Sequence, residues 1–278
     1  MQPQMFSSSE HIAFIGGGNM ASAIIGGLLK SGLPPSHVQV IEPFSAQCAR
    51  LAQQFGVEVS EAPGEALQRA SLVVWAVKPQ TFRDAAAQSR AHTQGALHLS
   101  VAAGIRTGTI AGWLGTERVV RAMPNTPALI GQGMTALFAR PAANKADRLA
   151  VERVVQTTGD FLWLGEEAQL DAVTALSGSG PAYVFYFIEA MVQAATEMGL
   201  SPEQAHQLAI GTFVGASALA KEATEPLDVL RARVTSKGGT THAALVSMEQ
   251  GGIKAAFIQA IHAARQRATD MGDEFSAA

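Results

Sequence analysis

Cysteine and clustered basic residues are scarce in this sequence, and each shortage excludes a class of protein. Cys48 is the single cysteine among 278 residues, so a disulfide within the chain is excluded and a reducing compartment is favoured. We expect its thiol on the buried face of a helix, as an inert apolar group. The formal net charge is −3, without a run of lysine or arginine, which predicts no nucleic-acid partner.

Long apolar runs are missing as well. The most apolar late segment, residues 183–195, contains Glu189 and Gln193 and is too short and too polar to cross a bilayer. The first ten residues lack the basic region and apolar core of a signal peptide. We therefore expect no membrane association and a cytoplasmic location. The sequence also has neither a metal-ligand cluster nor a nucleophile paired with a base, so we expect no metal site.

A glycine-rich turn near the start of the chain carries the strongest functional pattern. The apolar run at residues 12–15 leads into Gly16-x-Gly18-x-x-Ala21, and apolar residues at helical spacing follow. In the dinucleotide fingerprint, the first glycine allows a tight turn and the second lets the backbone approach a pyrophosphate. The small alanine lets the helix pack on the strand. This context favours a nucleotide site over a bare structural turn.

Glu42 follows the next expected strand, residues 38–41. An acid at this position can accept hydrogen bonds from the adenosine ribose hydroxyls of a dinucleotide. The same carboxylate would repel a 2′-phosphate, which favours NADH over NADPH. The sequence alone leaves both coenzymes open.

The apolar pattern changes near residue 166. Before it, β-like runs alternate with helix-like stretches, which predicts a doubly wound, mostly parallel, Rossmann-like sheet. The expected strands are residues 12–15, 38–41, 57–59, 72–77, 97–101, 119–120, 133–139 and 161–164. The expected helices between them are residues 45–55, 64–70, 82–91, 107–114 and 145–157. We place a dinucleotide-binding domain at residues 1–166 and an all-helical domain at residues 167–278.

Polar segments at the strand ends should meet in one crevice, because ligands of such sheets bind beyond the carboxyl ends of the strands. Lys78 lies there, and it either offsets pyrophosphate charge or is a solvated lysine before a proline turn. Residues 102–104 follow the next strand. The loop 123–127, with two prolines, lies under a nicotinamide ring or is a purely structural turn.

The helical half begins with a serine- and glycine-rich stretch, residues 177–182, which we expect to be a flexible loop with Pro181 in the first turn of a helix. The next helix, residues 183–198, is apolar around most of its circumference and so needs burial on several sides. The helix at residues 202–221 is rich in alanine and glycine, which suits close packing against a second subunit or within one core. A last helix is expected at residues 253–269.

A second glycine pair precedes the helix expected at residues 242–250. The segment from Ser236 to Thr241 contains Gly238, Gly239 and Thr240, with a hydroxyl-bearing residue expected at the helix cap. Free amides beside hydroxyls suit a carboxylate better than a large apolar ligand. The alternative is an ordinary capped helix start.

Several motifs taken together resemble the pyrroline-5-carboxylate reductase family. The similarity runs from about residue 11 to residue 271, and the serine-glycine segments of the helical half are its most specific parts. The motifs, in order, are FIGGGNMA, AVKPQ, SVAAG, RAMPNTPA, LSGSGPAYVFYFIEA and VTSKGGTTHAAL. The resemblance implies reduction of L-1-pyrroline-5-carboxylate to L-proline, the last step of proline biosynthesis, with NADPH or NADH. It also implies a helical domain that binds substrate and forms a homodimer, that five dimers can assemble into a decamer, and that active sites are shared between subunits.

The resemblance also assigns site residues. It places at the coenzyme the residues Ile15, Gly16, Gly17, Gly18, Asn19, Met20, Ala76, Val77, Lys78, Pro79, Val101, Ala102 and Ala103, to which the strand-end argument adds Glu42. It places the substrate at Ser236, Gly238, Gly239, Thr240 and Thr241.

The chemistry of an imine gives these substrate residues their expected roles. A C=N carbon accepts hydride more easily when the nitrogen is protonated, so the site must hold an iminium and a carboxylate with little water. We expect the carboxylate on the amides of Gly238, Gly239 and Thr240. Thr241, the catalytic residue, would hydrogen-bond the ring nitrogen and orient it, since threonine is a poor Brønsted acid.

Two positions near this segment stay open. Lys237 stands where many relatives carry proline, which changes the stiffness and charge of the segment. Arg233 lies just upstream and contacts either coenzyme or solvent.

Two other functions fit parts of the sequence. A 3-hydroxyacid dehydrogenase also joins a dinucleotide domain to helices, but its lysine relay needs a nearby asparagine, and Lys221 has none close in sequence. A protein that binds NAD(P) without turnover would need no carboxylate-binding segment.

Overall fold

The computed structural model describes residue 6 and residues 10–277. The expectation about a signal peptide concerns residues that lie largely outside this described part. The chain forms two compact units. The sheet unit is Met1–Ser179 with Ala264–Ala278, and the helical unit is Gly180–Ala263. The predicted limits, 1–166 and 167–278, stay a prediction about domains. The compact units differ from them because the end of the last helix packs with the sheet unit.

An eight-stranded sheet organises the sheet unit, in the order β3-β2-β1-β4-β5-β6-β7-β8. Its strands pair in parallel except for β6 with β7, which are antiparallel. This confirms the predicted doubly wound, mostly parallel fold. The strands are β1 (Ile12–Ile15), β2 (Val38–Ile41), β3 (Glu58–Ser60), β4 (Leu72–Trp75), β5 (Leu97–Ser100), β6 (Val119–Met123), β7 (Gly133–Ala139) and β8 (Gly159–Trp163).

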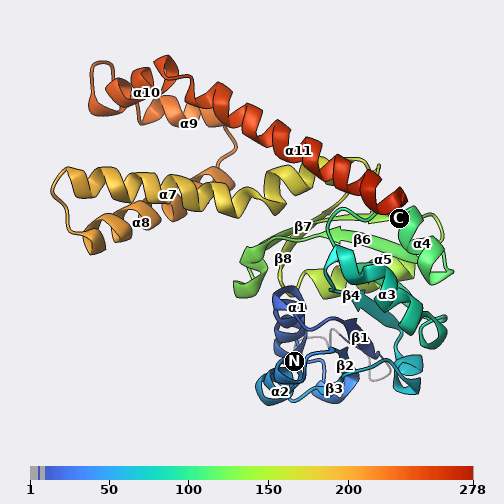
Figure 1. Ribbon diagram of the computed structural model, residues 1–278. Coiled ribbons are helices and arrows are strands. Elements are labelled where there is room, and N and C mark those ends of the chain that lie inside the picture. The colour runs from blue at the N-terminus through green and yellow to red at the C-terminus, as the bar shows by residue number, and fades with distance from the viewer. Residues whose placement is uncertain (1–5, 7–9, 278) are drawn as a thin grey trace. The chain divides into compact units, whose positions relative to one another are not determined.

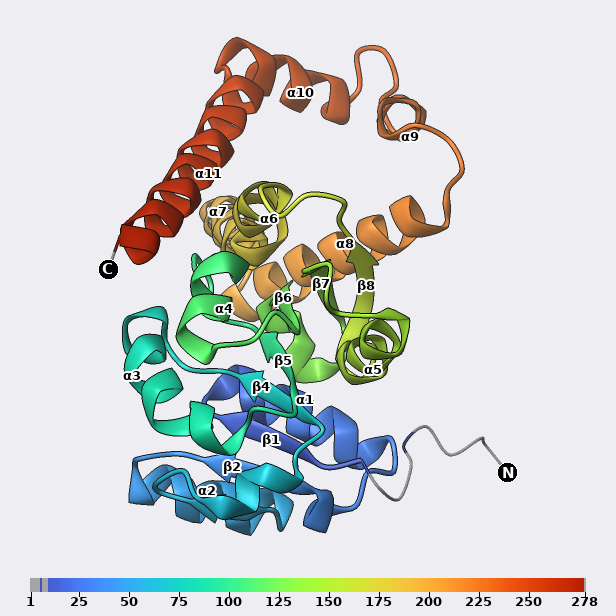
Figure 2. The ribbon, with the colours of Figure 1, turned by 90° about the vertical axis from the view of Figure 1, so that its right-hand side faces the viewer.

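Both faces of the sheet are covered, because alternate side chains of a strand point to opposite faces. Phe14 of β1 belongs to one buried cluster, with Ile25 of α1 (Asn19–Lys30) and Val151 of α5 (Lys145–Val155). Ala13 belongs to the other cluster, with residues of α3 (Pro79–Ser89), such as Phe82, and of α4 (Thr107–Leu114). Figure 2 shows α3 and α4 on one side of the central strands and α5 on the other. The continuous apolar run of β4 is thus buried on both faces.

The helices largely follow the predicted pattern. They are α1 (Asn19–Lys30), α2 (Ser45–Phe55), α3 (Pro79–Ser89), α4 (Thr107–Leu114), α5 (Lys145–Val155), α6 (Gln169–Val173), α7 (Gly180–Glu197), α8 (Pro202–Glu222), α9 (Leu227–Arg233), α10 (Thr240–Gln250) and α11 (Ile253–Ala277). The helix predicted at residues 64–70 is a 3-10 helix, Glu65–Arg69. Helix α9 was not anticipated, and α11 continues beyond the predicted end at residue 269.

The prediction of a flexible loop at residues 177–182 is wrong. A π-helix occupies Thr174–Gly178 between α6 and α7. It is closed by Ser179, whose amide and hydroxyl both donate to the Thr174 carbonyl, at 2.9 and 3.0 Å. These bonds satisfy the backbone where serine and glycine composition alone favours a loop. Such single wide turns inside helices are frequent at functional sites.

The helical unit buries little of its apolar surface. Helices α7 and α8 pack against each other (Figure 1), and α8 buries only Ala205 and Ala209 among its residues. Large side chains stay exposed along both helices, including Tyr186 at 69% and Leu219 at 70%. The predicted burial of α7 on several sides is therefore not achieved within one chain. Among the described residues, none of the helices has the length and apolar character needed to span a membrane.

Candidate active site

The turn after β1 has the geometry that the glycine pattern predicts. Gly16 has a φ of +94°, which side-chain-bearing residues rarely adopt. A Cβ at Gly16 would lie 2.7 Å from the Ala76 carbonyl oxygen, whereas a Cβ at Gly18 would meet nothing within 4 Å. Gly18 caps α1 without any side-chain hydrogen bond. The first amides of α1 therefore have no acceptor from the cap side chain, and the backbone at Gly18 leaves room for an anion to approach them.

Two side chains from the β2–α2 segment hold the middle glycine in place. The Glu42 carboxylate accepts hydrogen bonds from the Gly17 amide at 2.8 Å and from the Phe44 amide at 3.1 Å. Gln47 donates from its side-chain amide to the Gly17 carbonyl. Glu42 is only 7% exposed. Its carboxylate thus fixes the glycine turn, a role the sequence did not predict, and its contact with a ribose stays a prediction.

The other predicted coenzyme segments meet the glycine turn at the same edge of the sheet. The Ala76 amide donates to the Ile15 carbonyl at 2.8 Å, and the Val101 amide donates to the Trp75 carbonyl at 3.0 Å. The ends of β1, β4 and β5 are therefore adjacent, as the predicted crevice requires. Lys78 is exposed just before Pro79, the first residue of α3.

The loop after β6 has a structural role in addition to any role beside a coenzyme. The Asn125 side chain accepts from the Met134 amide at 2.9 Å and donates to the Ser177 carbonyl at 3.2 Å. It therefore joins the end of the sheet to the π-helix. The 3-10 helix Thr126–Ile130 also packs against α1. Contact of this loop with a nicotinamide ring stays a prediction.

These features fit a dinucleotide. The turn leaves room for a pyrophosphate at Gly18 and free amides at the start of α1, while Gly16 and Gly17 have no room for a side chain. Glu42 lies at the end of β2, where the adenosine ribose of a dinucleotide binds.

The second predicted site lies at the start of α10 in the helical unit. Gly239 is the cap of α10 and makes no side-chain cap hydrogen bond, so the expected hydroxyl-bearing cap is wrong. Its amide donates to the Ser236 carbonyl at 3.0 Å, and Gly238 has a φ of +75°. Because the Gly239 amide already has an acceptor, it is not available to a carboxylate as expected. The amides of the first turn of α10, beginning with Thr240, are the ones that face outward.

The residues around this segment are mostly exposed. Thr241 is half-buried, whereas Ser236, Lys237 and Thr240 are exposed. Arg233 is exposed to solvent, one of the two contacts that the sequence left open, and it also donates to the Glu225 carboxylate at 2.6 Å. The segment is thus held by local bonds.

Cys48 differs from its prediction. Its side chain is half-buried, and its thiol donates to the Glu42 carbonyl at 2.9 Å. Burial raises the pKa of this thiol, and the nearby Glu61 and Glu42 carboxylates raise it further. The thiol therefore stays protonated at neutral pH and has a hydrogen bond rather than a purely apolar environment.

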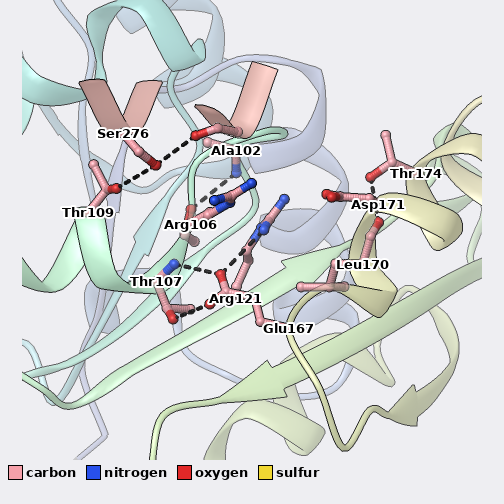
Figure 3. A network of polar contacts seen from close by, with 12 residues as sticks. Ala102, Arg106, Thr107, Thr109, Arg121, Glu167, Leu170, Asp171, Thr174 and Ser276 are labelled. Atoms are coloured by element: carbon pink, nitrogen blue, oxygen red, sulfur yellow. Dashed lines mark hydrogen bonds and ion pairs between the residues drawn. The ribbon is translucent and has the colours of Figure 1, made fainter. Parts of the chain in front are cut away.

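A polar network joins the sheet to α4, to the segment before α6 and to the end of α11 (Figure 3). The Glu167 carboxylate accepts from the amide and hydroxyl of Thr107, both at 2.6 Å, and pairs with buried Arg121 at 3.3 Å. Burial lowers the pKa of Arg121, and Glu167 opposes this shift. Arg106 pairs with Asp273 on α11 at 2.6 Å. No pattern in the sequence marked these residues, because their partners are far away along the chain.

The comparisons with known proteins agree with this geometry. Residues 167–271 match the family model described as pyrroline-5-carboxylate reductase dimerisation, and residues 11–104 match NADP oxidoreductase coenzyme F420-dependent. A pyrroline-5-carboxylate reductase of Pseudomonas aeruginosa is 42% identical over 270 residues, which cover 96% of this chain and 98% of that protein. The chain belongs to the pyrroline-5-carboxylate reductase family.

Solved structures extend the similarity to the fold of the whole chain. The pyrroline-5-carboxylate reductase of Coxiella burnetii has a TM-score of 0.88 at 36% identity and covers 95% of this chain and 99% of its own. A Plasmodium falciparum pyrroline carboxylate reductase with NADP bound has a TM-score of 0.87 at 26% identity, over 96% and 100% of the two chains.

Family membership confirms the activity expected from the sequence. The chain is an NAD(P)H-dependent oxidoreductase that reduces pyrroline-5-carboxylate, a small molecule, in proline biosynthesis. The match to a dimerisation family also indicates that it forms a homo-oligomer, which accounts for the exposed apolar side chains of the helical unit.

Proposed function

We propose that the chain performs this reduction with two backbone sites, one in each compact unit. The coenzyme binds at the turn Gly16–Gly18, and the substrate carboxylate binds at the start of α10. The observation that carries the proposal is that each site ends in a helix start whose amides have no side-chain cap. Both ligands are anionic, and uncapped helix starts attract anions.

At the first site, the chain holds and orients the coenzyme. The amides of Asn19 and Met20 bind the pyrophosphate, which approaches closely at Gly18 because no side chain stands there. The ribose hydroxyls bind Glu42, and Lys78 offsets phosphate charge. The segments Ala76–Pro79 and Val101–Ala103 line the remaining path along the strand ends. The bound reduced nicotinamide supplies the hydride.

At the second site, the chain holds the imine by both of its polar groups. The amides of Thr240 and Thr241 replace Gly239 as the main donors to the carboxylate, together with Gly238, and Ser236 lines the turn. The Thr241 hydroxyl hydrogen-bonds the ring nitrogen and orients the ring. The nitrogen is protonated in solution or by a bound water, because a threonine hydroxyl is too weak an acid to donate a proton outright.

We further propose a homodimer formed by the helical unit, with a decamer of five dimers as the larger assembly. The support is that α7 and α8 expose large apolar side chains along their length, including Phe185 and Val214. The single thiol is consistent with a reducing location such as the cytoplasm.

The test is to incubate the protein with L-1-pyrroline-5-carboxylate and each reduced coenzyme while following the loss of nicotinamide absorbance. We expect oxidation only when imine and coenzyme are both present, with L-proline as product. A protein that binds NAD(P) without turnover would oxidise neither coenzyme, and that result would contradict the proposal.

A further inference from the structure

Two carboxylates lie at neighbouring strand ends beside the expected adenosine site. Glu42 follows β2 and Glu61 follows β3, and Ile41 pairs with Ser60 in the parallel register between these strands. The Glu42 amide donates to the Ser60 carbonyl at 3.0 Å. The two acidic residues therefore leave the sheet side by side. Glu61 had no assigned role in the sequence pattern.

Glu42 cannot move away from this edge without breaking its hydrogen bonds to two backbone amides. One carboxylate oxygen accepts from the Gly17 amide and the other from the Phe44 amide. Each carboxylate oxygen has a second lone pair that can accept a ribose hydroxyl. The carboxylate can thus bind an unmodified ribose while it keeps the glycine turn fixed, but it cannot withdraw to admit a phosphate.

Glu61 takes up the hydroxyl that a phosphate at this position would use. Ser45, the first residue of α2, donates its hydroxyl to Glu61 at 2.6 Å. A serine in the first turn of a helix is an ordinary phosphate ligand. Here its hydrogen is directed to a carboxylate, and a second negative charge lies next to the helix start.

We propose that Glu42 and Glu61 together make this chain select NADH over NADPH. The inference rests on the proposed function, since it places the coenzyme at the glycine turn. A 2′-phosphate at the end of β2 would lie near two carboxylates, and the nearby Ser45 hydroxyl would already be engaged by Glu61. NADH has hydroxyls at this position and meets neither obstacle.

Glu61 gives the cleaner test, because a change at Glu42 would also release the glycine turn. The full-length oligomer is titrated calorimetrically with NADH, NADPH, 5′-AMP and adenosine 2′,5′-bisphosphate, at low and high salt. The variants are Glu61→Gln and the double variant Glu61→Gln with Ser45→Ala. The matched control is Glu58→Gln, the same substitution on β3, at an exposed residue paired with Arg69.

We expect the wild-type protein to bind NADH and 5′-AMP more tightly than their 2′-phosphorylated counterparts. Loss of one unit charge a few ångströms from a phosphate, near the surface, should tighten NADPH and bisphosphate binding about 5- to 30-fold. The Kd for NADH should stay within about twofold. The gain should shrink at high salt and in the double variant, and Glu58→Gln should have no such effect.

Other outcomes separate the inference from the proposed function. Equal binding of NADH and NADPH by the wild-type protein, or an unchanged ratio in Glu61→Gln, would overturn the selection and leave the reductase intact. An NADH Kd that is the same in the wild-type protein and in Gly18→Ala would place the coenzyme away from the glycine turn and overturn both.

Discussion

The two backbone sites are built in different ways. The turn after β1 is enclosed by the sheet unit: the Gly16 amide donates to the Ile41 carbonyl, and Glu42 and Gln47 hold Gly17. The segment before α10 has only local bonds, such as that from the Gly239 amide to Ser236, and most of its side chains are exposed. The proposed coenzyme site is therefore held by bonds within its own unit, whereas the proposed substrate site has much less support from its unit.

The difference follows from where each unit buries its apolar residues. The sheet unit has two buried clusters, one on each face of the sheet, so its strand ends are rigid in a single chain. The helical unit leaves its apolar side chains exposed and depends on assembly for burial. The coenzyme site should therefore survive in a monomer, whereas the substrate site should need the oligomer.

The largest expected effect comes from disrupting the dimer, which should affect the substrate site and spare the coenzyme site. Val214→Glu introduces a charge on α8, where Val214 is 66% exposed in one chain. An isologous interface receives the charge twice, and each buried unpaired charge costs about 3–5 kcal/mol. The dimer dissociation constant should rise on the order of 10⁴-fold or more, as measured by sedimentation. Coenzyme binding should persist while turnover is lost.

The matched control is Leu149→Glu on α5 of the sheet unit, where Leu149 is 46% exposed. This control should leave the mass of the oligomer in sedimentation and the reductase activity unchanged. A Val214→Glu protein that remains dimeric and active would show that the exposed face of α8 is not the interface.

The glycine turn can be tested by separating strain from ligand access. Gly18→Ala has space in the free protein, so the melting temperature should stay unchanged while the KM for the coenzyme rises about 10²-fold, because the backbone can no longer approach the pyrophosphate. Gly16→Ala should also destabilise the fold, by about 1–2 kcal/mol for the positive φ alone. Gly26→Ala, within α1 and in ordinary contact with Phe55, is the control: it should leave the KM for the coenzyme unchanged and raise the melting temperature slightly, because alanine favours a helix interior. Equal melting temperatures for Gly16→Ala and Gly18→Ala would contradict the geometry of the turn.

A change at the proposed substrate site should alter the kinetic parameters of the imine and leave the KM for the coenzyme unchanged. Thr241→Ala removes the proposed hydrogen bond to the ring nitrogen, worth about 1.5–3 kcal/mol to a charged group, so kcat/KM for the imine should fall about 10- to 100-fold. The KM for the coenzyme should stay constant, and Thr241→Ser should restore most of the activity. A coenzyme effect equal to the imine effect would remove Thr241 from the substrate site. Gly239→Val should likewise raise the KM for the imine more than that for the coenzyme, since a side chain there would collide with Ser236.

The smallest effect at neutral pH concerns the sheet core. His98 is 1% exposed, and its Nδ1 accepts from the Trp75 indole at 3.0 Å. Burial lowers the pKa of His98 to about 4, against the opposing influence of the Thr93 backbone. The folded form therefore favours the neutral ring. Its contribution is fully present above the unfolded pKa of about 6.5 and is lost as the pH falls from there to about 4, up to roughly 3 kcal/mol.

Urea unfolding between pH 7 and pH 4 measures this loss. His98→Gln removes the titrating group, so the free energy of unfolding should depend less steeply on pH in that range. His206, His242 and His262 of the helical unit are exposed, so His262→Gln is the control and should leave the slope unchanged. An unchanged slope in His98→Gln would show that another group causes the acid sensitivity.

The sequence predicted those features that depend on local patterns. Gly16 and Gly18 mark a turn by themselves, and the run of β4 marks a strand buried on both faces. The contacts that sequence reasoning missed join distant partners: Glu42, expected only at a ribose, reaches Gly17 across 25 positions, and Arg106 reaches Asp273 across 167. The stretch Ser177–Gly178 was misread as a loop because the bonds that keep it helical come from Ser179 and Asn125, which composition does not reveal.

Amide hydrogen exchange tests the two-site account most directly. L-Proline, the product, should slow exchange at Thr240 and Thr241 and leave Asn19 and Met20 unchanged, while NADH should do the reverse. Protection of the glycine turn by proline, or no protection at the start of α10, would contradict the assignment of one anion to each helix start.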